Sequence, residues 1–324
     1  MTEPGIILSI CITTRNRADF LRQTIASILP QVDSRVEVII VDGASTDHTR
    51  QVVLEYQGEF PCLRYFRKET NSGVDRDYNS SVEAARGEYC WFMSDDDLLK
   101  PGAIRAILSE TTKKYSLLVI NAEDWDAVFA KRIRERRLPF SKNRLYAPSE
   151  GEQFFIDTAH HLSFIPALVI RRDLWLSRER EIYFGSWFAH VGVVFQAPLP
   201  GNALLMANPI IAIRNENISW KSRIFEIWMI RWPSLVWSFN NFSDASKKRI
   251  CPKDPAKNWR ALLDYRASGA YSYEEYKKFI LPKTHGVRFR ILPALVSIAP
   301  VPIINALSHM YHRIRPHQPK NPTQ

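Results

Sequence analysis

The chain has 324 residues, of which 45% are hydrophobic and 24% are charged. This composition excludes a disordered, collagen-like or coiled-coil protein, and the length suits one large domain with an appended part. The net charge of +10 is uneven: residues 1–215 hold 26 Lys and Arg against 27 Asp and Glu, whereas residues 216–324 hold 18 against 7. We therefore expect the last third to meet nucleic acid, an acidic partner or an anionic membrane surface.

The cysteines and the first residues indicate a cytoplasmic protein. The four cysteines stand singly, most of them in apolar runs, without any Cys-x-x-Cys spacing. This usage predicts reduced thiols. Residues 1–5 lead directly into a strand-like run, so we expect no signal peptide.

The first 125 residues alternate short β-branched runs with amphipathic stretches. The runs are too continuously apolar for half-exposed strands, so they predict a mostly parallel sheet that is buried on both faces. Such alternation is typical of a doubly wound α/β domain. The expected strands are 6–13, 36–41, 63–67, 88–94 and 116–121, and the expected helices are 18–29, 47–56, 77–85 and 101–113.

Beyond residue 125 the pattern changes twice. Residues 128–148 are rich in Arg, Ser, Asn and Pro and predict a surface loop, whereas residues 150–213 regain mixed α/β character. After residue 217 only amphipathic helical segments remain, so we divide the chain into an α/β domain at 1–216 and a basic helical region at 217–324. The further expected strands are 167–171 and 203–214, and the further expected helices are 187–196, 220–239, 256–266, 273–279 and 287–313.

Polar residues follow four of the expected strands. Because ligands bind outside the carboxyl ends of parallel strands, we expect these segments to form one site. The chain has neither Gly-x-Gly-x-x-Gly nor Gly-x-x-x-x-Gly-Lys-Ser/Thr, so a nucleotide would be held by carboxylates and a metal. The four segments are 13–17, 42–47, 71–77 and 94–97.

The last segment contains three consecutive aspartates. Asp95, Asp96 and Asp97 would repel one another unless a positive group lay between them. A Mg²⁺ or Mn²⁺ ion bound to phosphate oxygens would remove this repulsion. The alternative, in which one carboxylate faces the dipole of the next helix and the others face water, explains one aspartate but not three. Asp42, before Gly43, is either a ligand-binding carboxylate or an ordinary turn residue.

Together these segments resemble the GT-A-fold glycosyltransferases of family 2. Residues 9–17, Ser-Ile-Cys-Ile-Thr-Thr-Arg-Asn-Arg, are similar to that family's opening strand and Thr-Tyr-Asn-Arg turn. Residues 38–47 are similar to its Val-Asp-x-x-Ser-x-Asp segment, and residues 71–97 are similar to the stretch that leads into its metal-binding Asp-x-Asp motif. The resemblance covers residues 6–105, in order and at family spacing.

The resemblance implies transfer of a sugar from a nucleotide-diphosphate sugar to an acceptor hydroxyl, with inversion at the anomeric carbon. It implies that Asp42 hydrogen-bonds the base and that Thr13 and Arg15 line the nucleoside pocket. Gly73 also falls on the nucleotide-binding side. The resemblance leaves open whether the donor is CDP-, UDP- or GDP-linked.

The resemblance also gives roles to the acidic residues. Asp95 and Asp96 would contact the nucleotide, and Asp96 and Asp97 would hold the Mg²⁺ or Mn²⁺ that neutralises the diphosphate leaving group. This chain departs from the family at Ser94, which replaces the first Asp of the usual Asp-x-Asp-Asp. A tyrosine also stands where the family often has arginine, so we expect Arg76 to contact phosphate.

An inverting transferase needs a group that takes the acceptor's proton. The family usually supplies an acidic residue at the start of a helix downstream of the metal motif, but residues 185–191 contain no carboxylate. His190 is therefore the candidate catalytic base. The alternative is a histidine of the protein core, in which case Asp157, His160 and His161 are the next candidates.

Residues 185–190 and the later pattern Arg-Asn-x-Asn-x-x-Trp at 214–220 resemble the branch that contains abequosyltransferases and related O-antigen enzymes. This narrower resemblance implies a role in bacterial surface polysaccharide synthesis. The acceptor would then be a saccharide, and we expect it to be linked to a lipid.

The C-terminal run at 291–311 is uncharged and long enough to cross a bilayer, but its prolines and polar residues make it a poor span. The alternatives are a helix of the domain core and a helix in the membrane interface. Trp228, Trp232 and Trp237, with basic neighbours, favour the interface. We expect a protein that is peripheral on the inner, anionic face of the cell membrane.

Two other functions fit part of the sequence. The pI near 9.5 and the Arg-rich stretch at 131–137 are compatible with a nucleic-acid-binding module, but three carboxylates at the site would repel a phosphate backbone. We therefore expect no nucleic-acid partner. A nucleotidyltransferase would carry a glycine-bearing loop after the first strand, and residues 13–17 lack glycine.

Overall fold

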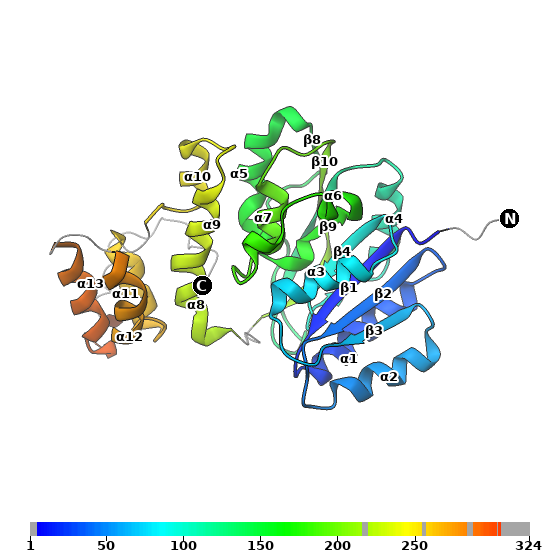
Figure 1. Ribbon diagram of the computed structural model, residues 1–324, viewed down its shortest axis with the longest axis horizontal. Helices are drawn as coiled ribbons and strands as arrows, with labels where there is room; N and C mark the ends of the chain where they lie inside the picture. Colours follow the sequence, from blue (N-terminus) through cyan, green and yellow to red (C-terminus); the bar gives the residue numbers. More distant parts are fainter. Residues whose placement is uncertain (1–4, 216–219, 255–256, 284–287, 303, 306–324) are drawn as a thin grey trace. The chain divides into compact units, whose positions relative to one another are not determined.

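The computed structural model describes residues 5–215, 220–254, 257–283, 288–302 and 304–305 (Figure 1). The chain forms two compact units. The first comprises Met1–Asn217 and Phe239–Ser246, and the second comprises Ile218–Ser238 and Lys247–Gln324.

A ten-stranded sheet organises the first unit, in the order β3-β2-β1-β4-β9-β6-β10-β5, with β7 on β6 and β8 on β10. The pairs β1–β2, β1–β4, β2–β3 and β6–β10 are parallel, whereas β9 runs antiparallel to both β4 and β6. The strands are β1 (Leu8–Thr14), β2 (Val36–Asp42), β3 (Leu63–Arg67), β4 (Tyr89–Met93), β5 (Leu98–Leu99), β6 (Leu117–Trp125), β7 (Arg132–Arg134), β8 (Arg144–Tyr146), β9 (Leu168–Arg171) and β10 (Ala203–Arg214).

The helices of the first unit cover both faces of this sheet (Figure 1). Ile10 of β1 belongs to one hydrophobic cluster with Leu21, on the first helix after β1. On the opposite face, the Phe92 ring of β4 lies 5.2 Å from the Tyr78 ring and 4.9 Å from the Trp175 ring. Burial on both faces explains the continuous apolar runs of these strands. The helices are α1 (Ala18–Ile28), α2 (Thr49–Glu59), α3 (Val74–Ala84), α4 (Ala103–Thr111), α5 (Gly151–Leu162), α6 (Arg172–Leu176) and α7 (Ala189–Phe195).

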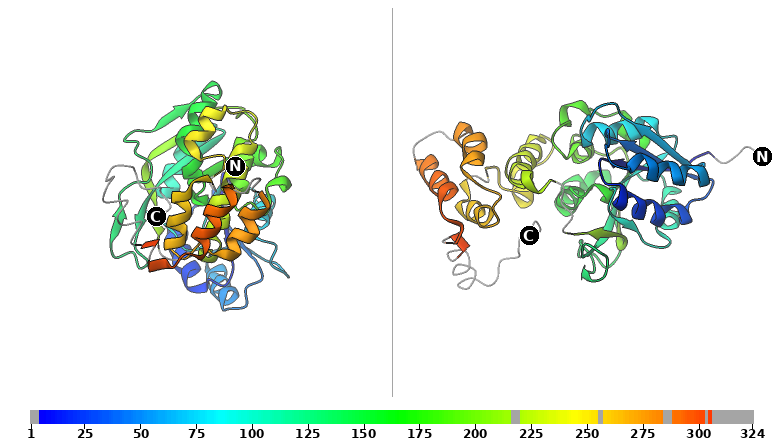
Figure 2. Two further views of the ribbon diagram at one scale, coloured as in Figure 1. Left: turned by 90° about the vertical axis from the view of Figure 1, so that its left-hand side faces the viewer. Right: turned by 90° about the horizontal axis from the view of Figure 1, so that it is seen from below.

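The second unit is helical, as expected from its sequence pattern, and its helices pack around a cluster that includes Phe225, Leu262 and Tyr271 (Figure 2). α8 continues through a π-helical turn at Ile227–Arg231 into α9. The helices that follow α7 are α8 (Ile224–Glu226), α9 (Trp232–Ser238), α10 (Asp244–Ile250), α11 (Trp259–Ala267), α12 (Tyr273–Glu275) and α13 (Arg288–Ile298).

The structure differs from the expected elements in several places. The stretch 128–148, expected to be a loop, contains β7 and β8, which pair with neighbouring strands. Residues 239–246, assigned to the helical region, pack with the first unit, because the Phe242 ring stacks on Phe155 with centroids 4.1 Å apart. The expected helix at 287–313 is described as α13, and residues 306–313 lie outside the described part.

No helix within the described residues is long and apolar enough to span a bilayer. The alternative of a spanning helix at 291–311 therefore has no support in the part of that run that the structure describes. All four cysteines are free, as the sequence predicts.

Candidate functional site

The carboxyl ends of β2, β1 and β4 lie next to one another in the sheet. Thr14 pairs with Asp42 at the end of β2, and Ile12 pairs with Met93 at the end of β4. The parallel register therefore brings the segments 13–17, 42–47 and 94–97 to one edge, as the sequence predicts. We call this edge the donor edge.

Hydrogen bonds join the turn after β1 to the turn after β2. The Asn16 amide donates to Ser45 Oγ over 2.9 Å, and the Thr46 amide donates to Asn16 Oδ1 over 2.7 Å. Asn16 has a φ of +55°, a conformation that asparagine tolerates better than most residues. Thr13 is partly exposed and Arg15 is exposed, so both predicted nucleoside-binding residues lie at the surface of this edge.

Asp42 is fully buried at the end of β2. Its Oδ1 accepts the Ser45 amide at 2.8 Å, and its Oδ2 accepts the Tyr65 hydroxyl at 2.5 Å. Burial and this carboxylate raise the pKa of Tyr65. Asp42 therefore shapes the turn at 42–45, and because its carboxylate is enclosed here, its predicted hydrogen bond to a base stays a prediction.

Two arginines contact the three aspartates after β4. Arg17 donates from Nε to Asp95 Oδ1 over 2.9 Å and also forms an ion pair with Asp96. Arg214, at the end of β10, donates its amide to Asp97 Oδ1 over 2.8 Å and its Nε to the Asp96 carbonyl oxygen over 3.0 Å. Neither arginine has a predicted role from the sequence, although Arg17 closes the Thr-Thr-Arg-Asn-Arg turn.

Burial controls the ionisation of this cluster. It raises the pKa of Asp95 to about 6 against the opposing charge of Arg17, and it raises the pKa of Asp96 against Arg17 and Arg214. Burial and the neighbouring charge of Asp96 raise the pKa of Asp97 to about 8. The metal-free cluster therefore carries less than three negative charges at neutral pH.

The donor set fits a divalent cation in part. Carboxylate oxygens suit Mg²⁺ and Mn²⁺, and the side chains of Asp95 and Asp96 are 11% and 18% exposed. Asp97 is enclosed, because its carboxylate already bonds the Arg214 amide and Ser94 Oγ. Among the described residues no three acidic, His or Cys side chains form a complete metal site. Asp95 and Asp96 thus fit a cation that takes further ligands from a diphosphate, whereas Asp97 makes structural contacts here and its predicted ligand role stays a prediction.

The first turn of α3 borders the same edge. Gly73 precedes it with a φ of +88°, in the left-handed region that favours glycine. A Cβ on Gly43 would lie 2.9 Å from Asp77 Oδ2, so the turn after β2 and the first turn of α3 are in close contact. Arg76 is exposed, and its guanidinium lies 4.8 Å from the centre of the Phe184 ring. The predicted phosphate-binding residue therefore stands at the rim of the donor edge.

His190 lies in the core and is only 4% exposed. Its Nε2–H donates to the Leu162 carbonyl oxygen over 2.7 Å, and burial lowers its pKa to about 4. Its contacts are those of the core histidine that was weighed as the alternative to a catalytic base. The His190 ring is neutral at physiological pH, and its Nε2–H satisfies the carbonyl group of the last residue of α5.

The next candidates are also engaged in structure. Burial lowers the pKa of His160 to about 4 and that of His161 to about 3, and His161 Nε2 donates to the Ile120 carbonyl oxygen over 2.8 Å. Asp157 accepts from Arg144 at 2.8 Å and from the Tyr146 hydroxyl at 2.9 Å. The side chains of Asp157 and His161 thus connect α5 to neighbouring strands.

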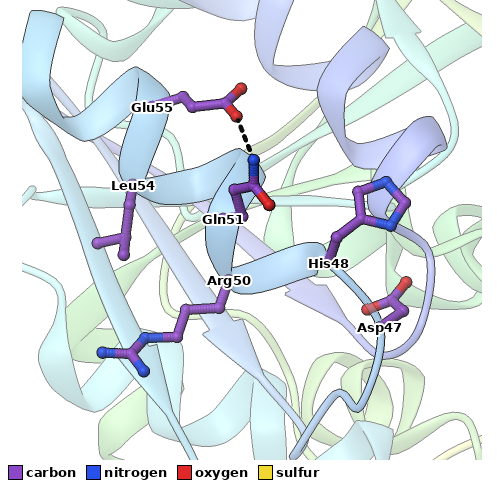
Figure 3. A pocket seen from close by; sticks show the side chains of 6 residues that line it. All are labelled: Asp47, His48, Arg50, Gln51, Leu54 and Glu55. Carbon is purple, nitrogen blue, oxygen red and sulfur yellow. Dashed lines mark hydrogen bonds between the residues drawn. The ribbon is translucent and has the colours of Figure 1, made fainter.

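A surface hollow of about 530 Å³ lies beside α2 (Figure 3). Its polar side chains bond one another or nearby backbone: Gln51 donates to Glu55 over 3.2 Å, and Asp47 accepts the Thr49 and Ala18 amides at 3.0 and 3.2 Å. Asp47 therefore satisfies amides at the starts of α2 and α1, and this hollow is separate in its lining from the aspartate cluster.

The sequence profile described as glycosyl transferase family 2 matches residues 9–174, just over half of the chain. The chain belongs to this family. It is 24% identical over 232 residues to the abequosyltransferase RfbV of Salmonella typhimurium, covering 67% of this chain and 69% of that protein. It is 31% identical over 110 residues to the GalNAc(5)-diNAcBac-PP-undecaprenol β-1,3-glucosyltransferase of Campylobacter jejuni, covering 34% of this chain and 36% of that one.

Solved structures show the same fold. The structure of S. aureus TarS 1–349 with UDP-GlcNAc has a TM-score of 0.58 at 14% identity and covers 95% of this chain and 92% of that one. The mannosyltransferase PcManGT from Pyrobaculum calidifontis, with GDP-Man and Mn²⁺, has a TM-score of 0.53 at 15% identity and covers 98% and 82%. The fold of this family 2 chain is the GT-A α/β fold with a helical C-terminal part, as the sequence resemblance implied.

The raised pKa of Asp97 makes the stability of the metal-free protein depend on pH. A carboxyl group that holds its proton more tightly when folded stabilises the fold fully below the unfolded pKa near 3.9, and this contribution is lost as pH rises through about 8. We expect the melting temperature to fall between pH 5 and pH 9, and to fall less in Asp97→Asn. Asp33→Asn is the control, because Arg35 lowers the pKa of Asp33. An equal fall in Asp97→Asn and the wild type would contradict this origin.

Replacement of His190 by alanine distinguishes a structural role from a role as catalytic base. We expect His190→Ala to lose roughly 1–3 kcal/mol of stability, because the Leu162 carbonyl group loses its buried partner. Turnover per folded molecule should stay near that of the wild type. Urea unfolding and initial rates corrected for folded protein measure the two quantities. A loss of roughly 10²–10⁴-fold in turnover with unchanged stability would instead establish His190 as the base.

Proposed function

We propose that this family 2 glycosyltransferase transfers a sugar from a nucleotide-diphosphate donor to a hydroxyl group of a saccharide acceptor, with inversion at the anomeric carbon. The observation that carries the proposal is the donor edge, where Asp42 and a buried aspartate cluster contacted by Arg17 and Arg214 follow neighbouring parallel strands. Nucleotidyl transfer and nucleic-acid binding, the other two functions considered, are disfavoured by membership of this family.

The proposed roles follow the edge from the nucleoside to the diphosphate. Asp42 would accept a hydrogen bond from the base, and Thr13, Arg15 and Gly73 would border the nucleoside. Arg76 would contact phosphate from the rim, where it is exposed. CDP-, UDP- and GDP-linked sugars are all candidate donors, and the relatives with UDP, UDP-GlcNAc and GDP-Man support the last two classes.

Asp95 and Asp96 are the residues that would hold Mg²⁺ or Mn²⁺ in this chain. Such a cation would neutralise charge on the departing nucleoside diphosphate. Arg17 already lies against both carboxylates, so its guanidinium is positioned to share the donor's negative charge. Fixed cations at the point where charge develops lower the barrier without reorganisation during the reaction.

The proposed acceptor is a saccharide linked to a lipid, in the synthesis of a bacterial surface polysaccharide. The abequosyltransferase and the undecaprenol-linked glucosyltransferase among the relatives support this class. The second unit would bind the anionic inner surface of the membrane, consistent with the excess of Lys and Arg after residue 216. The enzyme would then work as a peripheral protein on the cytoplasmic face.

Two of the three tryptophans expected to anchor the protein at the membrane are engaged within the protein. Trp232 is buried, and the Trp237 indole donates to the Cys251 carbonyl oxygen over 3.2 Å. On α13, by contrast, Ile291, Leu295 and Ile298 are 53%, 55% and 61% exposed at helical spacing. The proposed membrane contact is therefore this face of α13.

Metal removal tests the role of the aspartate cluster. We expect EDTA to abolish nucleotide release from a panel of UDP-glucose, UDP-GlcNAc and GDP-mannose, and added Mn²⁺ or Mg²⁺ to restore it. UDP or GDP should raise the melting temperature with Mn²⁺ and much less without it, since a ligand of the native state stabilises in proportion to its occupancy. Full activity in chelator would leave Arg17 and Arg76 to balance the diphosphate, and pyrophosphate release would indicate nucleotidyl transfer.

Vesicle binding tests the membrane contact. We expect the protein to sediment with phosphatidylcholine vesicles that contain phosphatidylglycerol, and binding to weaken as salt rises. The double variant Leu295→Asp/Ile298→Asp should lose most of this binding. Leu54→Asp, at a leucine on α2 that is 47% exposed, should keep it. Equal binding to neutral and anionic vesicles, or undiminished binding of the double variant, would contradict the proposal.

A further inference from the structure

A buried carboxylate joins α3 to a loop far along the chain. Asp75, in the first turn of α3, is 6% exposed. Its Oδ2 accepts the amides of Gly185 and Trp187 at 2.8 and 3.0 Å, and its Oδ1 accepts the Ala189 amide at 3.2 Å. Ala189 is the first residue of α7, so the same side chain holds the loop at 185–189 and neutralises the start of that helix.

The backbone of the loop has an unusual conformation at two positions. Gly185 has a φ of +83°, and Trp187 has a φ of +74°, which is unfavourable for a residue with a side chain. Strained backbone of this kind persists where the surroundings over-determine it, and it is concentrated at functional sites. The three hydrogen bonds to Asp75 therefore help to hold this strained backbone in place.

Neighbouring residues fix both flanks of the loop. A Cβ on Gly192 would lie 2.4 Å from the Tyr183 ring, so this ring packs directly on the backbone of α7. The next residue, Phe184, lies under the guanidinium of Arg76 at 4.8 Å. The first turn of α3 thus contacts the loop through two successive side chains, Asp75 and Arg76.

The same turn of α3 also contacts the donor edge. Asp77 Oδ1 accepts the Ser72 hydroxyl at 2.5 Å, and its Oδ2 lies against Gly43, directly after Asp42. One helical turn therefore connects the nucleotide-binding turn to the loop at 185–189. The loop has no carboxylate, but its half-buried Trp187 and Ser186 supply an aromatic face and a hydroxyl group, which are suited to a sugar ring.

We propose that Asp75 is a positioning residue that holds the loop at 185–189 as a preformed wall for the saccharide acceptor. This proposal rests on the proposed function, because it assigns the acceptor side of the same site. Asp75 acts through the loop backbone and touches neither donor nor acceptor. Trp187 is the residue of the wall that meets the acceptor, and its left-handed backbone is maintained by Asp75.

Two variants of the full chain test the proposal. Asp75→Asn replaces one acceptor oxygen by an NH₂ group, which cannot accept from the loop amides. Trp187→Gly removes the ring but relieves the unfavourable φ, so it should melt at or above the wild-type temperature. Glu37→Gln is the matched control: Glu37 is a buried carboxylate that accepts the Arg86 amide at 2.6 Å and the Ser9 hydroxyl at 2.7 Å, at the opposite, amino-terminal edge of the sheet.

Three measurements are made on each protein. Amide hydrogen exchange follows residues 185–189, and calorimetry measures binding of UDP and GDP with Mn²⁺. Nucleotide release is measured from UDP-glucose, UDP-GlcNAc and GDP-mannose, both in water and with polyprenyl-diphosphate saccharides extracted from bacterial membranes. The water reaction reports the donor side alone, and the increase with the extract reports the acceptor.

We expect Asp75→Asn to speed exchange at Gly185, Trp187 and Ala189 at least tenfold and to lower acceptor-dependent release at least tenfold. Nucleotide affinity and release in water should stay within twofold of the wild type. Trp187→Gly should show the same loss with the acceptor. Glu37→Gln should lose melting temperature while keeping the ratio of the two release rates.

If amide hydrogen exchange at residues 185–189 is unchanged in Asp75→Asn, Asp75 does not hold the loop. If the ratio of nucleotide release with the acceptor to release in water changes equally in Glu37→Gln, Asp75 is only a structural residue. If Trp187→Gly keeps full acceptor-dependent release, the loop at 185–189 does not act as a wall for the acceptor. If the wild type binds no nucleotide and releases none from any donor, the proposed function fails. The exchange measurement alone then decides whether Asp75 holds the loop.

Discussion

Three buried carboxylates in succession cannot all be charged unless cations lie against them, and the donor edge is organised by this requirement. One arginine comes from the turn after β1 and the other from the end of β10. The Arg214 guanidinium is held between the rings of Phe20 and Phe129, at 5.0 and 4.4 Å. β5 follows the aspartates directly and pairs with β10, Leu98 with Ala212, and this pairing brings Asp96 and Asp97 to Arg214.

This neutralisation has a consequence for the chemistry. A cluster whose charge is already balanced by fixed arginines has only a limited capacity to attract a free cation, and among the described residues no complete metal site exists. A diphosphate brings the oxygens that such a site lacks. In the proposed function the edge would bind cation and donor together, and Asp97 holds α1 and β10 against it through Thr24 and the Arg214 amide.

The first turn of α3 has a comparable role on the other side. Asp77 contacts the turn after β2, and Asp75 receives three amides from the start of α7. Buried charges of this kind are costly unless they are hydrogen-bonded, so the turn and the loop stabilise each other. In this way the first turn of α3 connects the donor edge and the loop at 185–189 within the first unit.

The sequence by itself determined the fold class and the location of the donor edge. Continuous apolar runs followed by polar segments identify parallel strands and their carboxyl ends, because periodicity and strand polarity are local properties. The order of Thr-Thr-Arg-Asn-Arg, Asp42 and the three aspartates was sufficient for the family resemblance. The three consecutive aspartates also predicted a positive group beside them, because repulsion between adjacent carboxylates can be inferred from the sequence.

Only the tertiary structure decided which cations supply that charge and which polar residues are structural. Arg17 and Arg214 are 197 positions apart, and no pattern along the chain pairs them with Asp95–Asp97. His190 stands at the position where the family usually has a base, but its environment is set by α5, and a bond to the Leu162 carbonyl group occupies its ring nitrogen. Asp75 was one of many acidic residues in the sequence. Burial and hydrogen-bond partners are long-range properties, so they became visible only when the folded chain brought α3 against residues 185–189.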